Sequence, residues 1–511
     1  MKCFSPKYFS IVFSLAVAAA LASCNKDELL NKAPVTSLDN SNALVTEADY
    51  ISLTNSAYDP IQWQENGGPL STFPVMFQEI RADDCISQWA SYWTYGAVFD
   101  DFRLIKANNT TVLGWWQKWY TVVSRANAAM YFDSSYAGFT TPGLKERLIA
   151  EAKFLRALGY FQLVIHFGDV PLITKYIGST TDQIKYPRSS RAAIYAQIEK
   201  DLTDAVAVLP ESYSGGDLGR ATKGAAYTLL AKASLYQQDY AKTRSYCEAV
   251  INSGVYSLEG NYADNWSLSN EYGKESIFEI GYQSGFATAG ITNQGSFSYL
   301  YFGFIPAGTN AFGNCVPRQS LVDLYDNNDA RKDATFILPS TYMDDLGQTA
   351  YDAGTQFYEF YWTVPEALES QASVRKYYIP KSVATSLTTI GSSPLNEKIF
   401  RYADVLLMHA EAAVMGAGGD GLGSLNQVIA RAYGNNSHNL GSYTLDDVKR
   451  QRRLELATEG WDRFTDLVRW NDAGSTLAFK HFTPNRDELL PIPQAEIDLV
   501  GGDVLSQNPG Y

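Results

Sequence analysis

Residues 444–471 read TLDDVKRQRRLELATEGWDRFTDLVRWN, and no other part of the chain says more about its architecture. Thr444 and Asp447 stand three residues apart, as the two members of a capping box do, so we expect a helix to begin there. Glu459 and Arg463 stand at the i,i+4 spacing that suits an ion pair. Apolar residues recur at spacings of three and four, which predicts one long helix with a buried stripe made of Leu454, Ala457, Trp461, Phe464 and Val468.

Similar periodic patterns recur along the chain and predict further helices. The hairpin within 221–253 combines small and aromatic residues in a way that resembles a tetratricopeptide unit, in which small side chains let paired helices approach closely. The fold class is therefore predicted to be mainly α, a tetratricopeptide-like helical hairpin scaffold with long irregular insertions and a few short strands. The expected helical segments are one that begins at a second capping-box-like pattern, Thr46 to Asp49, and then 115–132, 144–167, 191–208, two arms within 221–253, 401–413 and 425–432.

Two kinds of side chain on these helices invite a functional interpretation that the pattern does not favour. Trp116, Trp119 and Val123 share one side of the helix predicted at 115–132, so we expect the tryptophans to lie in the core. His166 stands alone near the end of the next helix, where a histidine usually packs or interacts with the helix dipole. We therefore expect His166 to be structural.

Helical periodicity fails in two long segments, 69–104 and 259–393, which are rich in Gly, Asn, Ser, Thr and aromatic residues. Within them only short runs, such as 276–280, have a strand-like pattern. Long irregular segments between regular elements usually carry function, and the aromatic content argues against disorder. We predict a signal peptide at 1–23, a tether at 24–42 and one domain at 43–511, divided into an N-terminal helical repeat part at 43–258 and a loop-rich insertion plus C-terminal helical part at 259–511.

The first 24 residues are typical of an export signal. Lys2 and Lys7 precede an apolar run at 11–22, which is shorter than the roughly 20 residues that a membrane-spanning helix needs. The run ends in Leu-Ala-Ser-Cys24, which resembles a bacterial lipobox. That resemblance implies that Cys24 is lipidated and anchors the mature protein to a membrane.

Composition excludes several classes of function. The 511-residue chain has 46% hydrophobic and 19% charged residues, as a globular protein does, and a formal net charge of −14. A surface with this excess of acid repels phosphate backbones, so we expect no nucleic acid partner. None of the five cysteines forms a C-x-x-C spacing, so neither a metal cluster nor a disulfide framework is predicted.

The C-terminal stretch carries a family resemblance. The run Arg452-Arg-Leu-Glu-Leu-Ala to Trp470, then Leu490-Pro-Ile-Pro-Gln494, and the final Gln507-Asn-Pro-Gly-Tyr511 resemble the C-terminal motifs of the SusD/RagB family. The resemblance implies a glycan-binding lipoprotein of the outer membrane that faces the cell exterior. It further implies delivery of an oligosaccharide or polysaccharide to a SusC-like TonB-dependent transporter. Lys26-Asp27-Glu28, which follows Cys24 after one residue, is similar to the surface-export signal of Bacteroidetes lipoproteins.

A site for sugar rings needs flat aromatic side chains for their C–H faces and polar groups for their hydroxyls. The family resemblance favours the first two of three clusters, with Trp89, Trp93 and Tyr301 as the main candidates. About half of the aromatic residues are expected to pack loops instead. The first cluster is Arg81, Asp83, Asp84, Trp89, Tyr92, Trp93 and Tyr95; the second is Tyr282, Phe286, Tyr299, Tyr301, Phe302, Phe304, Asn314 and Arg318; the third is Phe357, Tyr358, Phe360, Tyr361 and Trp362.

No motif predicts catalysis or a cofactor. The sequence contains no G-x-S-x-G, H-E-x-x-H, Walker A or G-x-G-x-x-G pattern, so we expect a binding protein with no catalytic residue, no metal and no cofactor. Two alternatives stay open. A surface glycoside hydrolase needs only two suitably spaced carboxylates, which a sequence cannot reveal. A helical-repeat adaptor would bind only proteins and no glycan.

Overall fold

The computed structural model describes residues 44–62, 74–87, 94–178, 186–283, 315–338, 372–378 and 393–511, without the side chain of Tyr95. The predicted signal peptide, Cys24 and the tether at 24–42 therefore lie outside the described residues. Within the described part of the chain, no helix combines the length and the apolar character that crossing a membrane requires.

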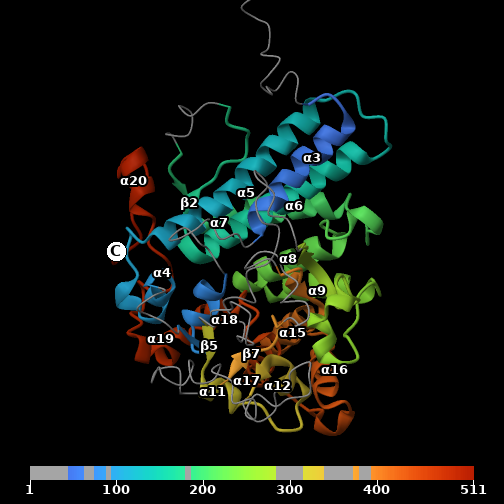
Figure 1. Cartoon of the computed structure of the whole chain (residues 1–511), viewed down its shortest axis with the longest axis vertical. Helices are drawn as coiled ribbons and strands as arrows, with labels where there is room; N and C mark the ends of the chain where they lie inside the picture. Colours follow the sequence, from blue (N-terminus) through green and yellow to red (C-terminus); the bar gives the residue numbers. More distant parts are fainter. Residues whose placement is uncertain are drawn as a thin grey trace, which may run out of the picture.

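Antiparallel helices stacked side by side build the scaffold (Figure 1). Consecutive helices from α5 to α9 pack against each other, and α9 continues the stack onto α15, which packs on α16. This is the predicted tetratricopeptide-like arrangement of helical hairpins. The scaffold helices are α3 (Glu47–Tyr58), α5 (Thr110–Ser135), α6 (Leu144–Phe167), α7 (Arg191–Val206), α8 (Lys223–Tyr236), α9 (Tyr240–Asn252), α15 (Tyr402–Ala412) and α16 (Gly421–Tyr433).

Local sequence explains where these helices begin. The predicted capping box at the start of α3 is confirmed: the Asp49 carboxylate accepts from the backbone N–H of Thr46 at 2.7 Å. Asn109 caps α5 and Ser190 caps α7 through their side-chain oxygens. The shorter helices are α4 (Thr94–Ala97), α11 (Gln319–Val322), α12 (Ala330–Thr335), α17 (Leu445–Leu456), α18 (Arg463–Arg469), α19 (Ala473–Thr476) and α20 (Gln494–Val500).

The core lies between the helices, and one hydrophobic cluster runs from Ala57 to Leu505. Trp119 is fully buried, as predicted, and α6 approaches it closely at Gly159. A Cβ on Gly159 would stand 2.9 Å from a Val123 methyl carbon and 3.2 Å from the Trp119 carbonyl oxygen. His166 is also buried, and burial lowers its pKa to about 3, so the ring is neutral and has a packing role.

Short antiparallel ladders join segments that are far apart in the chain. The predicted strand at 276–280 is confirmed as β4. In the described residues the ladders are two-stranded. They pair β1 (Cys85–Ser87) with β5 (Cys315–Pro317), β2 (Val170–Pro171) with β3 (Arg188–Ser189), β4 (Ser276–Ile280) with β8 (Glu397–Arg401), and β6 (Phe336–Ile337) with β7 (Ser373–Val374).

The C-terminal stretch differs from its prediction in one respect. The capping box at Thr444 is confirmed, but the expected single helix is two helices, α17 and α18. Thr458 and Gly460 adopt φ values of 66° and 86°, which break the helix between them. A Cβ on Gly460 would meet the Val75 backbone nitrogen at 3.3 Å, so the break lets the chain pass close to the segment that precedes β1.

The predicted ion pair between Glu459 and Arg463 is wrong, because the break separates the two side chains. The Glu459 carboxylate accepts from Arg401 at 2.6 Å and from Lys376 at 2.8 Å. The guanidinium of Arg463 instead pairs with Asp83 at 2.8 Å. Glu459 and Arg463 therefore each pair with residues that are distant in the sequence instead of with each other.

Candidate functional site

The β1–β5 ladder joins the described residues that flank the two segments with the main candidate residues, 88–93 and 284–314. Ser87 at the end of β1 pairs with Cys315 at the start of β5. Trp89 follows Ser87 by two residues, and Asn314 directly precedes Cys315. The two aromatic segments therefore start from adjacent positions. The candidates Trp89, Trp93, Tyr301, Phe302 and Asn314 lie outside the described residues, as do Tyr92, the side chain of Tyr95 and the third aromatic cluster.

A second contact joins the described residues that precede two segments, 63–73 and 284–314. The Gln62 side chain donates to the carbonyl of Gly281 at 3.0 Å. Lys118 on α5 donates to the carbonyl of Gln62 at 2.9 Å, and burial lowers the Lys118 pKa to about 7. Tyr282, a candidate residue, follows directly; it is half-buried against the core, and its N–H donates to the Asn396 side chain at 2.8 Å.

Arg81 lies in the interior beneath the β1–β5 ladder. Its guanidinium stacks on the Phe464 ring at 3.9 Å and donates to the carbonyls of Asp487 and Leu489 at 2.6 and 3.2 Å. Burial lowers the pKa of Arg81 to about 10, so it keeps its charge at neutral pH. These contacts tie the segment before β1 to the C-terminal tail, and contact of Arg81 with a ligand stays a prediction.

Asp83 and Asp84 are buried and ion-paired with arginines of the C-terminal stretch. Arg463 donates to both oxygens of Asp83 at 2.8 and 2.9 Å, and Arg453 donates to Asp84 at 2.7 Å. The carbonyl of Asp84 also accepts from the backbone N–H of Arg318 at 2.8 Å, which ties β5 to the same point. These contacts anchor the ladder, so direct contact of Asp83 or Asp84 with a ligand stays a prediction.

Glu79 is a third buried acid close to Asp84. Arg453 and Arg463 pair with Asp83 and Asp84, whereas Glu79 has no ion pair of its own among the described residues. The Glu79 carboxylate accepts from the Gly460 N–H at 2.9 Å. Burial, followed by repulsion from Asp84, raises the Glu79 pKa to about 8. The group therefore holds a proton at neutral pH, which balances the cluster.

Asp100 links the ladder to an exposed aromatic ring. It accepts from the N–H of Ser87 at 3.3 Å, from Lys480 at 2.5 Å and from Arg318 at 3.4 Å. The Arg318 guanidinium stands 4.8 Å from the centre of the Phe479 ring, which is 53% exposed. An exposed ring beside a guanidinium and a carboxylate suits a sugar. Sequence reasoning identified Arg318 but missed Phe479, because candidate aromatic residues were sought in the irregular segments 69–104 and 259–393 and Phe479 lies outside both.

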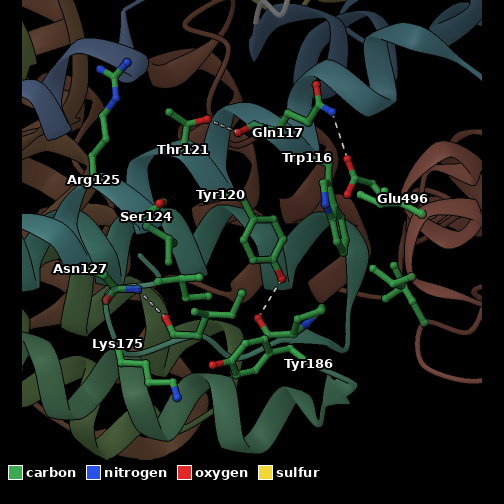
Figure 2. A pocket seen from close by; sticks show the side chains of 17 residues that line it. Trp116, Gln117, Tyr120, Thr121, Ser124, Arg125, Asn127, Lys175, Tyr186 and Glu496 are labelled. Carbon is green, nitrogen blue, oxygen red and sulfur yellow. Dashed lines mark hydrogen bonds between the residues drawn. The ribbon is translucent and has the colours of Figure 1, made fainter. Parts of the chain in front are cut away.

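A separate groove of about 590 Å³ is lined largely by residues of α5 (Figure 2). In Figure 1, α5 lies away from β5. Its polar groups are largely tied to the scaffold: Tyr120 donates to the carbonyl of Pro171 at 2.8 Å, and Gln117 donates to Glu496 at 3.0 Å (Figure 2). Among the residues that the structure describes, no group of three His, Cys, Asp or Glu side chains could hold a metal ion. Aromatic residues such as Trp116 and Tyr186 line this groove, and most of its polar groups serve the scaffold.

Comparison with known families identifies the chain. Residues 274–511 match the family described as "SusD family", and residues 30–235 match "Starch-binding associating with outer membrane". The chain belongs to the SusD family. The predicted resemblance to SusD/RagB proteins is thereby confirmed, and the match covers both the helical scaffold and the C-terminal stretch that anchors the ladder.

Several relatives of this SusD-family chain have been named for what they bind. A solved "Laminarin binding SusD-like protein" is 27% identical, with a TM-score of 0.77 and coverage of 91% of this chain and 99% of that one. "Surface glycan-binding protein A from Bacteroides thetaiotaomicron in complex with laminarihexaose" is 26% identical, with a TM-score of 0.76 and coverage of 91% and 100%. The "Starch-binding protein SusD" of the same species is 25% identical over 415 residues, which are 71% of this chain and 72% of that protein.

Proposed function

We propose that this SusD-family chain binds a glycan through aromatic side chains on the two segments that start from the β1–β5 ladder. The observation that carries the proposal is the pairing of Ser87 with Cys315, because these residues are the described ends of the two segments that contain Trp89 and Asn314 in the sequence. Buried ion pairs hold the ladder in place, and rigid support of this kind keeps binding residues in position. Phe479 and Arg318 add an exposed ring and a cation beside the ladder.

The first glycan to test is a β-1,3-glucan. Two of the solved relatives are named for laminarin or laminarihexaose, at 26–27% identity and TM-scores of 0.76–0.77. Starch is the second candidate, because the relative from Bacteroides thetaiotaomicron is named for it. Both are neutral polymers of glucose, which fits a site built from aromatic rings and hydrogen-bonding groups.

The finer part of the proposal concerns location and delivery. We infer that Cys24 carries the lipid anchor, that the protein faces the exterior on the outer membrane, and that it passes oligosaccharide to a SusC-like TonB-dependent transporter. The lipobox-like Leu-Ala-Ser-Cys24 and the family membership support this inference. Globomycin, which blocks lipoprotein signal cleavage, is expected to leave an uncleaved precursor in cells. Cys24→Ala is expected to release the protein from the membrane fraction.

Incubation of the purified protein with laminarin, starch and an unrelated polysaccharide tests the proposal. A binding protein migrates more slowly in native gels that contain the cognate glycan, and it releases no new reducing ends. New reducing ends would instead support the hydrolase alternative. Unchanged mobility with every glucan, together with capture of a protein partner, would support the adaptor alternative and contradict the proposal.

A further inference from the structure

Two buried cysteines lie on the β1–β5 ladder. Cys85 pairs with Pro317 and Cys315 pairs with Ser87, so the two cysteines are diagonal neighbours. Residues two apart on a strand share a face, and paired residues share a face, so both thiols point to the same side of the ladder. Cys85 is fully buried and Cys315 is 1% exposed, and each thiol influences the pKa of the other through a hydrogen bond.

We propose that Cys85 and Cys315 form a disulfide when the exported chain folds in an oxidising compartment. The export signal predicted at 1–23 directs the chain to such a compartment, where disulfides persist. Cys247, in α9, is buried elsewhere in the described structure and has neither of these cysteines beside it in the chain or in a ladder. The sequence could not reveal the pair, because 230 residues separate its members.

The chemistry requires an oxidant and access to the thiols. The thiolate of one cysteine attacks a sulfur of a disulfide-bearing oxidant and forms a mixed disulfide. The second cysteine, as a thiolate, then displaces the oxidant's remaining sulfur, so the two cysteines lose two protons and two electrons and the oxidant becomes two thiols. Burial raises the pKa of both thiols in the folded protein, so the reaction takes place before the ladder is buried.

The bond would act on the bases of the two aromatic segments. Diagonal neighbours in an antiparallel pair have Cα atoms about 7–8 Å apart, whereas a disulfide holds them within roughly 7 Å, so the strands must approach by about 1 Å. A ladder of three residue pairs that belongs to no larger sheet can accommodate such a shift. The disulfide would then staple the start of the 88–93 segment to the end of the 284–314 segment.

Peptide mapping of the full-length chain, exported by its own leader, tests the proposal. The protein is denatured in an alkylating reagent without reductant, digested and examined by mass spectrometry. We expect alkylated Cys247 and a cross-linked peptide that joins Cys85 to Cys315, lighter by two hydrogens than the sum of its parts. After reduction, all three cysteines are expected to be alkylated.

Two variants keep the test decisive. Cys247→Ser is expected to leave the cross-linked peptide unchanged, whereas Cys85→Ser is expected to leave Cys315 alkylated without reductant. Refolding in a glutathione redox buffer provides a second source of protein, in which the same cross-link is expected. Free Cys85 and Cys315 in both preparations, or a cross-link of either to Cys247, would overturn the proposal.

Discussion

Replacing Glu79 by glutamine should make the protein more stable at alkaline pH. Glutamine has the shape of the protonated glutamate, so its side-chain oxygen can still accept from the Gly460 N–H. It never acquires the charge that burial and Asp84 oppose. The rise of the Glu79 pKa from 4.5 to about 8 corresponds to a free energy on the order of 5 kcal/mol, because each tenfold change in proton affinity is about 1.4 kcal/mol.

The sign follows from proton linkage. Between pH 4.5 and about 8 the folded protein holds a proton on Glu79 that the unfolded chain has released. The stabilising contribution of this proton is thus fully present below pH 4.5 and is lost as the pH rises toward about 8. Asp133 and Asp462 act in the same direction, since their pKa values are raised to about 7 and about 6. Comparison of the Glu79→Gln variant with wild type isolates the contribution of Glu79.

Urea or guanidinium denaturation at several pH values measures the effect. The variant's free energy of unfolding, relative to wild type, should grow by about 1.4 kcal/mol per pH unit through the window and then level off. Glu146→Gln is the matched control: Glu146 is exposed in the first turn of α6, so its difference from wild type should be small. A Glu79→Gln difference that stays flat or falls as the pH rises would refute the reasoning.

Three further substitutions test the anchor and the core by denaturation. Arg463→Ala leaves Asp83 buried with one fewer cation and should cost about 3–5 kcal/mol; a loss below about 1 kcal/mol would argue against a structural ion pair. Gly460→Ala should cost at least about 1 kcal/mol, since φ is 86° and the Val75 nitrogen is close, whereas an unchanged midpoint would contradict the helix break. Trp119→Ala should cost about 3–5 kcal/mol because the ring is fully buried; stability near that of wild type would contradict its core position.

Local patterns predicted much of the scaffold. The residues of α6 and β4 agree with the predicted ranges. Helical periodicity up to Gly168 defines the helix, and a short run that contains Ile and Phe favours a strand. Both capping boxes are confirmed for the same reason: each depends on residues only three apart. Where the determinants are local, the sequence was sufficient.

Long-range contacts explain the failures. The helix predicted over 444–471 breaks because Glu459 turns toward Arg401 and Lys376, partners that lie 58 and 83 residues away in the chain. Local patterns also could not show that Arg81 contacts Phe464 and the chain near Asp487, and its contact with a ligand stays a prediction. The β1–β5 register likewise depends on tertiary contacts that strands of three residues cannot encode by periodicity.

The central claim is that aromatic side chains on the segments based at the β1–β5 ladder bind a glycan. Titration calorimetry with laminarin, or with whichever glucan retards the protein in gels, should compare wild type with Trp89→Ala and Trp93→Ala. Tyr131→Ala is the control, because Tyr131 is also exposed, at 56%, but lies on α5 away from the ladder. We predict at least a roughly tenfold loss of affinity for each tryptophan variant, since a stacked ring contributes about 1 kcal/mol beyond the area that it buries. Wild-type affinity in both tryptophan variants would contradict the claim.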